Sequence, residues 1–105
     1  MNKKIIDKME QYAAALKRES VPIDHLYVFG SAAHGEQHEW SDIDVGVVGK
    51  AFASDRIEEM TQLQVIADEI DSAISPLPLR PEDMSDRFSA TIQAIQKEGK
   101  EIAIQ

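Results

Sequence analysis

The sequence contains no cysteine, which excludes disulfide bonds and thiolate chemistry. It also lacks a long hydrophobic run, since no stretch approaches the roughly 20 apolar residues that a membrane-spanning helix needs. The first residues, MNKKIIDKMEQ, are charged and contain no apolar signal-peptide core. These absences give no sign of a membrane association and make the cytoplasm the default location.

Basic residues are also few. The chain has 11 Lys and Arg residues against 19 Asp and Glu, and its formal net charge is −8. A protein that binds a nucleic-acid backbone normally presents a basic patch, whereas the basic residues here are scattered. The acidity makes nucleic acid an unfavourable direct substrate, and it favours a basic protein partner.

The length of 105 residues predicts a single domain over residues 1–105 with one modest core. With 43% hydrophobic and 29% charged residues, the chain has the composition of a globular protein. It is too short to combine a catalytic domain with a large substrate-binding domain. The sequence leaves the oligomeric state open.

Apolar periodicity predicts helices over residues 2–19 and 55–71 and a helical region in two pieces over 81–98. Strands are expected over 24–29, 42–48 and 72–80, with a short one within 101–105. The order helix-strand-strand-helix-strand-helix indicates an α/β (α+β) fold, a small mixed sheet with helices packed on it. The third strand carries Pro76 and Pro78, which cannot donate to a ladder, so we expect it at or near a sheet edge.

The second helix has a predicted buried stripe and a predicted solvent-exposed side. The stripe consists of Ile57, Met60, Leu63, Ala67 and Ile70. Its acidic residues, Glu58, Glu59, Asp68, Glu69 and Asp71, are expected to face solvent. Asp55 and Glu58 form an expected capping pair at its start.

The stretch from Leu26 to Val48 contains the candidate chemistry. A first apolar strand ends at Gly30-Ser31, and a second begins at Asp42-Ile43-Asp44. Successive strand side chains point to opposite faces, so Asp42 and Asp44 share one face. Gly46 lies on that face too, where a missing side chain would leave room for a ligand or mark a bulge.

Two neighbouring carboxylates repel each other, and a hard divalent cation such as Mg²⁺ removes that cost. A Gly-Ser turn that opens a short helix would offer backbone N–H groups and a hydroxyl to a phosphate. Alone, Gly-Ser favours an ordinary turn, and Asp-x-Asp favours a solvated strand face. Their combination at this spacing instead predicts a metal–nucleotide site.

The polar loop between the two strands carries His34 and His38. Their spacing could suggest zinc, but the HExxH order and cysteine support are absent, so a solvated loop is the better interpretation. Trp40 has two interpretations: it covers a base, or it pins the loop to the core, which is commoner.

The arrangement Gly30-Ser31, ten residues, then Asp42-x-Asp44 is similar to the motif of the nucleotidyltransferase superfamily that includes DNA polymerase beta. The short length resembles its minimal nucleotidyltransferase branch, many of whose members are antitoxins or partners of HEPN-domain proteins. The motif covers roughly 20 residues and is far more specific than a lone glycine loop. The resemblance implies one or two Mg²⁺ ions on Asp42 and Asp44, and triphosphate binding at Gly30 and Ser31.

The chain departs from this family pattern at two places. Many relatives have a basic residue soon after Gly-Ser, and here His34 is the candidate for a phosphate contact. Relatives usually place a third carboxylate on the third strand, where Ser75 stands ahead of Pro76. A serine cannot replace a carboxylate as a metal ligand or base at neutral pH. Asp71, four residues upstream, is an alternative third position, although a surface acid at a helix end is the stronger interpretation.

Three functions follow as hypotheses. The first is Mg²⁺-dependent adenylyl transfer from ATP to a hydroxyl of a protein partner of HEPN type. The second is a weakened nucleotidyltransferase-fold binding module that neutralises such a toxin by forming a complex. The third is a metal-binding α/β domain with no nucleotide role.

Overall fold

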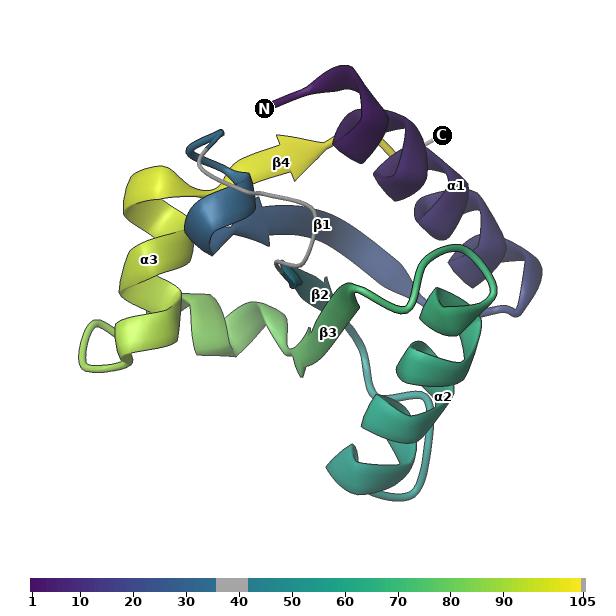
Figure 1. The fold of residues 1–105 in the computed structure, drawn as a ribbon. Coiled ribbons are helices and arrows are strands. Elements are labelled where there is room, and N and C mark those ends of the chain that lie inside the picture. Colours follow the sequence, from purple (N-terminus) through teal and green to yellow (C-terminus); the bar gives the residue numbers. More distant parts are fainter. Residues whose placement is uncertain (36–41, 105) are drawn as a thin grey trace.

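A computed structural model of the protein describes residues 1–35 and 42–104. Within these residues, a four-stranded sheet lies at the centre, in the order β3-β2-β1-β4, and three α-helices pack on it (Figure 1). The helices are α1 (Lys3–Arg18), α2 (Arg56–Asp68) and α3 (Ala90–Glu98). The strands are β1 (Ile23–Phe29), β2 (Ile43–Gly49), β3 (Ile74–Leu79) and β4 (Lys100–Ile102). The elements η1 (Gly30–Ala32) and η2 (Pro81–Ser85) are short 3₁₀ helices.

The predicted mixed α/β fold and its element order are confirmed. β1 and β2 are antiparallel, whereas β2 and β3 are parallel and joined by the helical crossover through α2. β3, with its two prolines, is an edge strand as expected. β4 pairs antiparallel with β1 and forms the other edge.

The two faces of the sheet carry separate apolar clusters. Ile43, Val45 and Val47 of β2 face the larger cluster, which joins the sheet to α1 and α2. Val48, on the opposite face, belongs to a smaller cluster with residues of β3 and α3. Figure 1 accordingly shows α1 and α2 on one side of the sheet and α3 on the other. Asp44 alternates with Ile43 and Val45, so it lies on the face that α3 covers.

Side-chain caps fix the starts of the helices. Asn2 accepts a hydrogen bond from the N–H of Ile5, Asp55 accepts one from Glu58, and Ser89 accepts one from Ile92. Each bond satisfies a backbone donor that a helix start leaves without a partner. α1 and α2 each start within one residue of the predicted position because the capping signals are local.

Two expectations for α2 are wrong. Ile57 and Met60, predicted in the buried stripe, are 78% and 44% exposed, whereas Leu63 and Ala67 are buried as expected. Glu59, predicted on the solvent-exposed side, is fully buried. The reason is a tertiary contact: both carboxylate oxygens of Glu59 lie 2.7 Å from Nη2 of Arg80, which follows β3. The backbone N–H of Phe52 also donates to Glu59.

α1 packs across α2 through a buried polar contact. The hydroxyl of Tyr12 donates a hydrogen bond to the carbonyl of Leu63 over 2.9 Å. Tyr12 is fully buried, and burial raises its pKa above the ordinary value of 10.0. The prediction that Tyr12 is a core residue is confirmed. Among the described residues, no helix is both long and apolar enough to cross a membrane.

Candidate functional site

The turn after β1 is built around Gly30. Gly30 has a φ of +70°, a left-handed conformation that a glycine adopts without the steric cost of a side chain. It opens η1, where the N–H groups of Ala33 and His34 donate to the carbonyls of Gly30 and Ser31. The predicted short helix at this turn is therefore present. Ser31, the candidate phosphate ligand, is half-buried in it.

Asp44 lies directly against this turn. Phe29 pairs with Asp44 across the two strands, which brings the Asp44 side chain beside Gly30. A Cβ added to Gly30 would sit 2.6 Å from Oδ2 of Asp44. Glycine is thus required here twice, by the backbone conformation and by the close approach of a carboxylate. The described geometry therefore places the Gly30 turn and the Asp44 carboxylate side by side.

The two acids repel each other. Burial, and then the negative charge of Asp42, raise the pKa of Asp44 above its ordinary value of 3.8. Asp42 is exposed, immediately before β2, and Asp44 is half-buried. The pair therefore concentrates negative charge at a place where one member is partly removed from water. A cation bound between them would offset both effects.

Ser75 occupies the third position on this face. It lies on β3 as the direct partner of Asp44 in the parallel ladder, and it is exposed. Asp71 does not approach this position, because its carboxylate accepts hydrogen bonds from Lys8 of α1 and from the N–H of Ala73. Those contacts lower the pKa of Asp71. The geometry aligns Ser75, and not Asp71, with the position where a third carboxylate was expected.

The space predicted beside Gly46 is filled. A Cβ at Gly46 would lie 3.2 Å from Cδ1 of Ile95 and 3.3 Å from Cδ1 of Leu79. α3 therefore packs onto the sheet at Gly46, so the expectation of room for a ligand is wrong. Among the described residues, Asp42 and Ser75 are exposed and Asp44 is half-buried, so these side chains lie beyond the part of the face that α3 fills at Gly46.

His34 contacts an acid that the sequence did not single out. Its Nε2 lies 2.7 Å from Oε2 of Glu98, the last residue of α3, and both side chains are well exposed. The contact joins the turn after η1 to the helix that covers the same face. No local signal links two residues 64 positions apart. A phosphate at His34 would compete with Glu98.

The donor set suits a hard cation. Asp42 and Asp44 offer carboxylate oxygens, and the hydroxyls of Ser31 and Ser75 come from neighbouring elements. Mg²⁺ is commonly held by one or two carboxylates together with substrate phosphates. Within residues 1–35 and 42–104, no group of three or more His, Asp or Glu side chains forms a metal cluster. The expectations for His38 and Trp40 lie outside the described residues.

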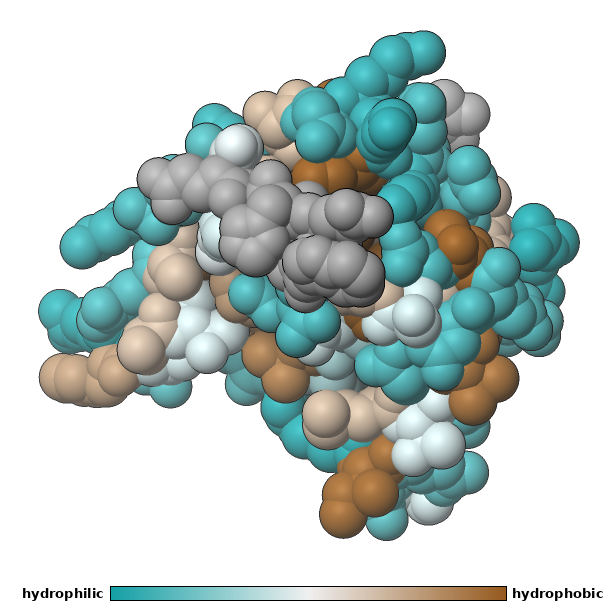
Figure 2. Space-filling model, viewed as in Figure 1, coloured by the Kyte–Doolittle hydropathy of each residue, from teal (hydrophilic) through white to brown (hydrophobic). Residues whose placement is uncertain are grey.

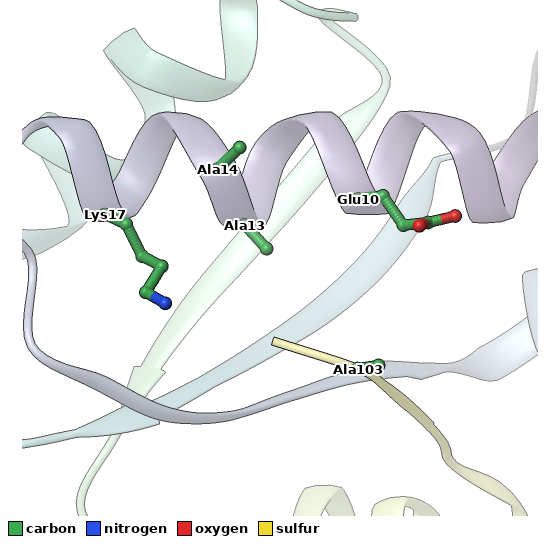
Figure 3. A pocket seen from close by; sticks show the side chains of 5 residues that line it. All are labelled: Glu10, Ala13, Ala14, Lys17 and Ala103. Carbon is green, nitrogen blue, oxygen red and sulfur yellow. The ribbon is translucent and has the colours of Figure 1, made fainter. Parts of the chain in front are cut away.

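A separate pocket lies near the C-terminal strand. It is lined by Glu10, Ala13, Ala14 and Lys17 of α1 and by Ala103, and its volume is about 60 Å³ (Figure 3). This space suits a few water molecules and is far too small for a nucleotide. It belongs to the helix on the opposite face from Asp44. The Asp pair remains the candidate site.

The chain is similar to known proteins over most of its length. Residues 9–104 match the family model of the nucleotidyltransferase domain. No curated protein sequence is similar enough to count as a match. Among solved structures, the chain is similar to one in a toxin–antitoxin complex with AMP-PNP, with 26% identity and a TM-score of 0.59. The alignment covers 91% of this chain and 73% of that one.

Two further structures show the same fold. One is a point mutant of the toxin–antitoxin MntA-HpeT, with 26% identity, a TM-score of 0.63 and coverage of 92% and 72% of the two chains. The other is the complex of a tri-AMPylated HEPN toxin of Shewanella oneidensis with an MNT antitoxin, with 22% identity, a TM-score of 0.54 and coverage of 93% and 71%. Since the family model spans nearly the whole sequence, from the first helix to the last strand, the chain belongs to the nucleotidyltransferase domain family.

Proposed function

We propose that this chain is a Mg²⁺-dependent nucleotidyltransferase that transfers an adenylyl group from ATP to a hydroxyl of a protein partner of HEPN type. The observation that carries the proposal is the contact of the Asp44 carboxylate with the Gly30 turn, with Asp42 beside it. The neighbours support the substrate and the partner. One is a toxin–antitoxin complex with AMP-PNP, and another contains a tri-AMPylated HEPN toxin.

Asp42 and Asp44 would hold Mg²⁺, which when bound neutralises charge on the phosphates. Gly30 leaves no side chain between the turn and the phosphates, and Ser31 adds a hydroxyl donor. The oxygen of the acceptor hydroxyl bonds to the α-phosphorus, the bond to the β-phosphate oxygen breaks, and pyrophosphate leaves. The acceptor proton passes to water, since Ser75 cannot accept it at neutral pH. The chain's contribution is positioning and charge.

A second function is favoured by one specific observation. Ser75, and no acid, pairs with Asp44 on β3. Without a carboxylate there, transfer would be slow, and the protein would act by covering its partner. The net charge of −8 suits a complex with a basic ribonuclease surface, because opposite charges steer association. In this case, tight binding and no covalent nucleotide are expected.

One experiment separates the two functions. The protein is incubated with Mg²⁺, with ATP labelled on the α-phosphate, and with the product of the neighbouring gene, and the proteins are then separated under denaturing conditions. Adenylyl transfer predicts label on the partner. The same reaction with γ-labelled ATP should leave the partner unlabelled, because pyrophosphate departs. Label from γ-labelled ATP would contradict nucleotidyl transfer and indicate phosphoryl transfer.

Matched variants test whether labelling of the partner depends on the Asp pair. Asp42→Asn and Asp44→Asn should each lower labelling by about a hundredfold or more, the usual effect of removing a group that stabilises transition-state charge. Asp24→Asn, an exposed acid on β1, should label as the parent does. A stable complex without label in the parent would favour the binding module. Equal labelling in all four proteins would contradict a catalytic role for the Asp pair.

A further inference from the structure

α2 carries an apolar surface that the described fold leaves open. Ile57 is 78% exposed, Val65 is 57% exposed and Met60 is 44% exposed. Single exposed apolar residues are normal on a protein surface, but several on one helix indicate a contact surface. In Figure 2, hydrophobic surface is visible at the lower tip of the molecule, where the start of α2 lies in Figure 1, with hydrophilic side chains beside it.

Two of these exposed residues, Ile57 and Val65, share one side of the helix. Ile57, Thr61 and Val65 are spaced four apart and therefore lie on one side of α2, which we call the α2 stripe. Leu63, Ile66 and Ala67 point the other way, into the core. A groove of about 280 Å³ runs beside the stripe, and Glu19 at the end of α1 forms its far wall. The helix thus presents an apolar ridge with a groove along it.

Acidic side chains border the stripe. Glu58 and Asp68 are exposed on α2, and Glu69 follows at its end and lines the groove together with Glu19. A second copy placed against the stripe would bring these carboxylates together, and each copy has a net charge of −8. Like charges across an interface oppose binding, whereas a border of lysine or arginine would be attracted. The charge pattern therefore selects a basic partner over self-association.

We infer that the α2 stripe is a docking surface for a protein segment with an apolar face bordered by Lys or Arg. The stripe lies on the helix that packs against the larger apolar cluster, on the opposite face of the sheet from Asp44. A bound partner would leave the Asp pair open. The inference goes beyond the proposed transfer reaction. Because it is tested without nucleotide, the docking surface and the adenylyl transfer can be contradicted separately.

The test uses a fluorescently labelled amphipathic peptide of leucine and lysine, about five helical turns long, with fluorescence anisotropy as the readout. A peptide with glutamate at every lysine position is the charge control. The parent should bind the lysine peptide and not the glutamate peptide. The variant Ile57→Ser/Val65→Ser removes the apolar ridge without changing the charge, and it should weaken binding by about tenfold or more. Because both side chains are exposed, the variant is expected to fold.

A matched variant tests location. Phe88, 90% exposed in the loop before α3, lies outside the stripe, so Phe88→Ser should bind the lysine peptide like the parent. Since the chain has no cysteine, Thr61→Cys can carry a photo-crosslinker, which should attach the peptide, whereas Gln93→Cys on α3 should not. Equal affinity of parent and double variant would overturn the inference. So would a concentration-dependent dimer, measured by analytical ultracentrifugation, that the double variant abolishes.

Discussion

At the scale of single residues, Gly30 and Gly35 can be compared directly. Both have a left-handed backbone, with φ of +70° and +73°. A Cβ at Gly30 would strike the Asp44 carboxylate, whereas a Cβ at Gly35 would have no neighbour within 4 Å among the residues that the structure describes. The two positions therefore share a backbone cost and differ in the contact with the candidate site.

We predict that Gly30→Ala and Gly35→Ala each lower the free energy of unfolding by about 1–2 kcal/mol, the cost of a left-handed alanine. Only Gly30→Ala should in addition lose Mg·ATP binding, because its methyl group displaces Asp44. Urea unfolding measures the first effect and calorimetric titration the second. Equal Mg·ATP affinity in the two variants would contradict the role given to Gly30.

Ser75 gives a prediction of increased activity. Ser75→Asp places a carboxylate next to Asp44, where it could take the acceptor proton. We expect the rate of labelling to rise by about 10–100-fold, below the full range for an evolved general base because the position is not refined. The measurement is the initial rate of transfer from α-labelled ATP.

Two controls isolate the position of the new acid. Ser75→Ala should be no faster than the parent, because it supplies no carboxylate to take the acceptor proton. Ser72→Asp adds the same charge to an exposed residue just before β3 and should also keep that rate. If Ser75→Asp were no faster than Ser72→Asp, the missing carboxylate on β3 would not be what limits the transfer rate of the parent.

At the scale of elements, the sequence predicts what depends on neighbours along the chain. The caps at Asn2, Asp55 and Ser89 each involve a residue three positions away, so the helix starts were predictable. The sequence did not predict which residues of α2 face solvent and which face the core. Glu59 is buried because Arg80, 21 positions later, pairs with it, and no periodic pattern within α2 reports that partner.

The pair of Glu59 and Arg80 links the start of α2 to the end of β3. Burial alone would raise the pKa of Glu59, but the hydrogen bonds from Arg80 and Phe52 outweigh burial and lower it below 4.5. A lowered pKa means that the charged form stabilises the fold. This stabilisation is complete above about pH 4.5 and is lost as the pH falls through the folded-state pKa.

We predict that Glu59→Gln lowers the free energy of unfolding at pH 7 by about 3 kcal/mol, because it leaves the Arg80 charge without its partner in a largely buried place. Glu69→Gln, at an exposed position, should change it by less than about 0.5 kcal/mol. Urea unfolding at neutral pH and again at about pH 3.5, below the ordinary glutamate pKa, measures both. The difference between Glu59→Gln and the parent should shrink at the lower pH, and a constant difference would contradict the assigned protonation.

At the scale of the whole molecule, the sheet separates the candidate site from the α2 stripe. The alternation along β2 put Asp44 on the face opposite Ile43 and Val45, and this was predictable from the sequence, whereas Asp42 lies immediately before the strand. That α3 covers Gly46 on the same face was not predictable, since it depends on packing against Ile95, far along the chain. Within the described part of the chain, α3 fills the face at Gly46, and Asp44 lies on the same face beside the Gly30 turn.

The ionised Asp44 carboxylate lowers the stability of the whole fold. Burial and the charge of Asp42 raise the pKa of Asp44, so its ionised form is less favourable in the folded protein than in the unfolded chain. A group with a raised pKa destabilises the fold at neutral pH, and that destabilisation is relieved as the pH falls through its folded-state pKa. Cations that bind the acids should relieve it at neutral pH too.

We therefore predict that, without Mg²⁺, Asp44→Asn has a higher Tm than the parent at neutral pH, and that this advantage shrinks as the parent's Asp44 becomes protonated at lower pH. Adding Mg²⁺ and ATP should raise the Tm of the parent, and leave that of Asp44→Asn nearly unchanged. Thermal unfolding followed by circular dichroism measures both, with Asp24→Asn as the control for removing one charge from a protein of net charge −8. A lower Tm for Asp44→Asn at neutral pH would mean that Asp44 serves the fold itself, and that its place beside Gly30 needs no cation to explain it.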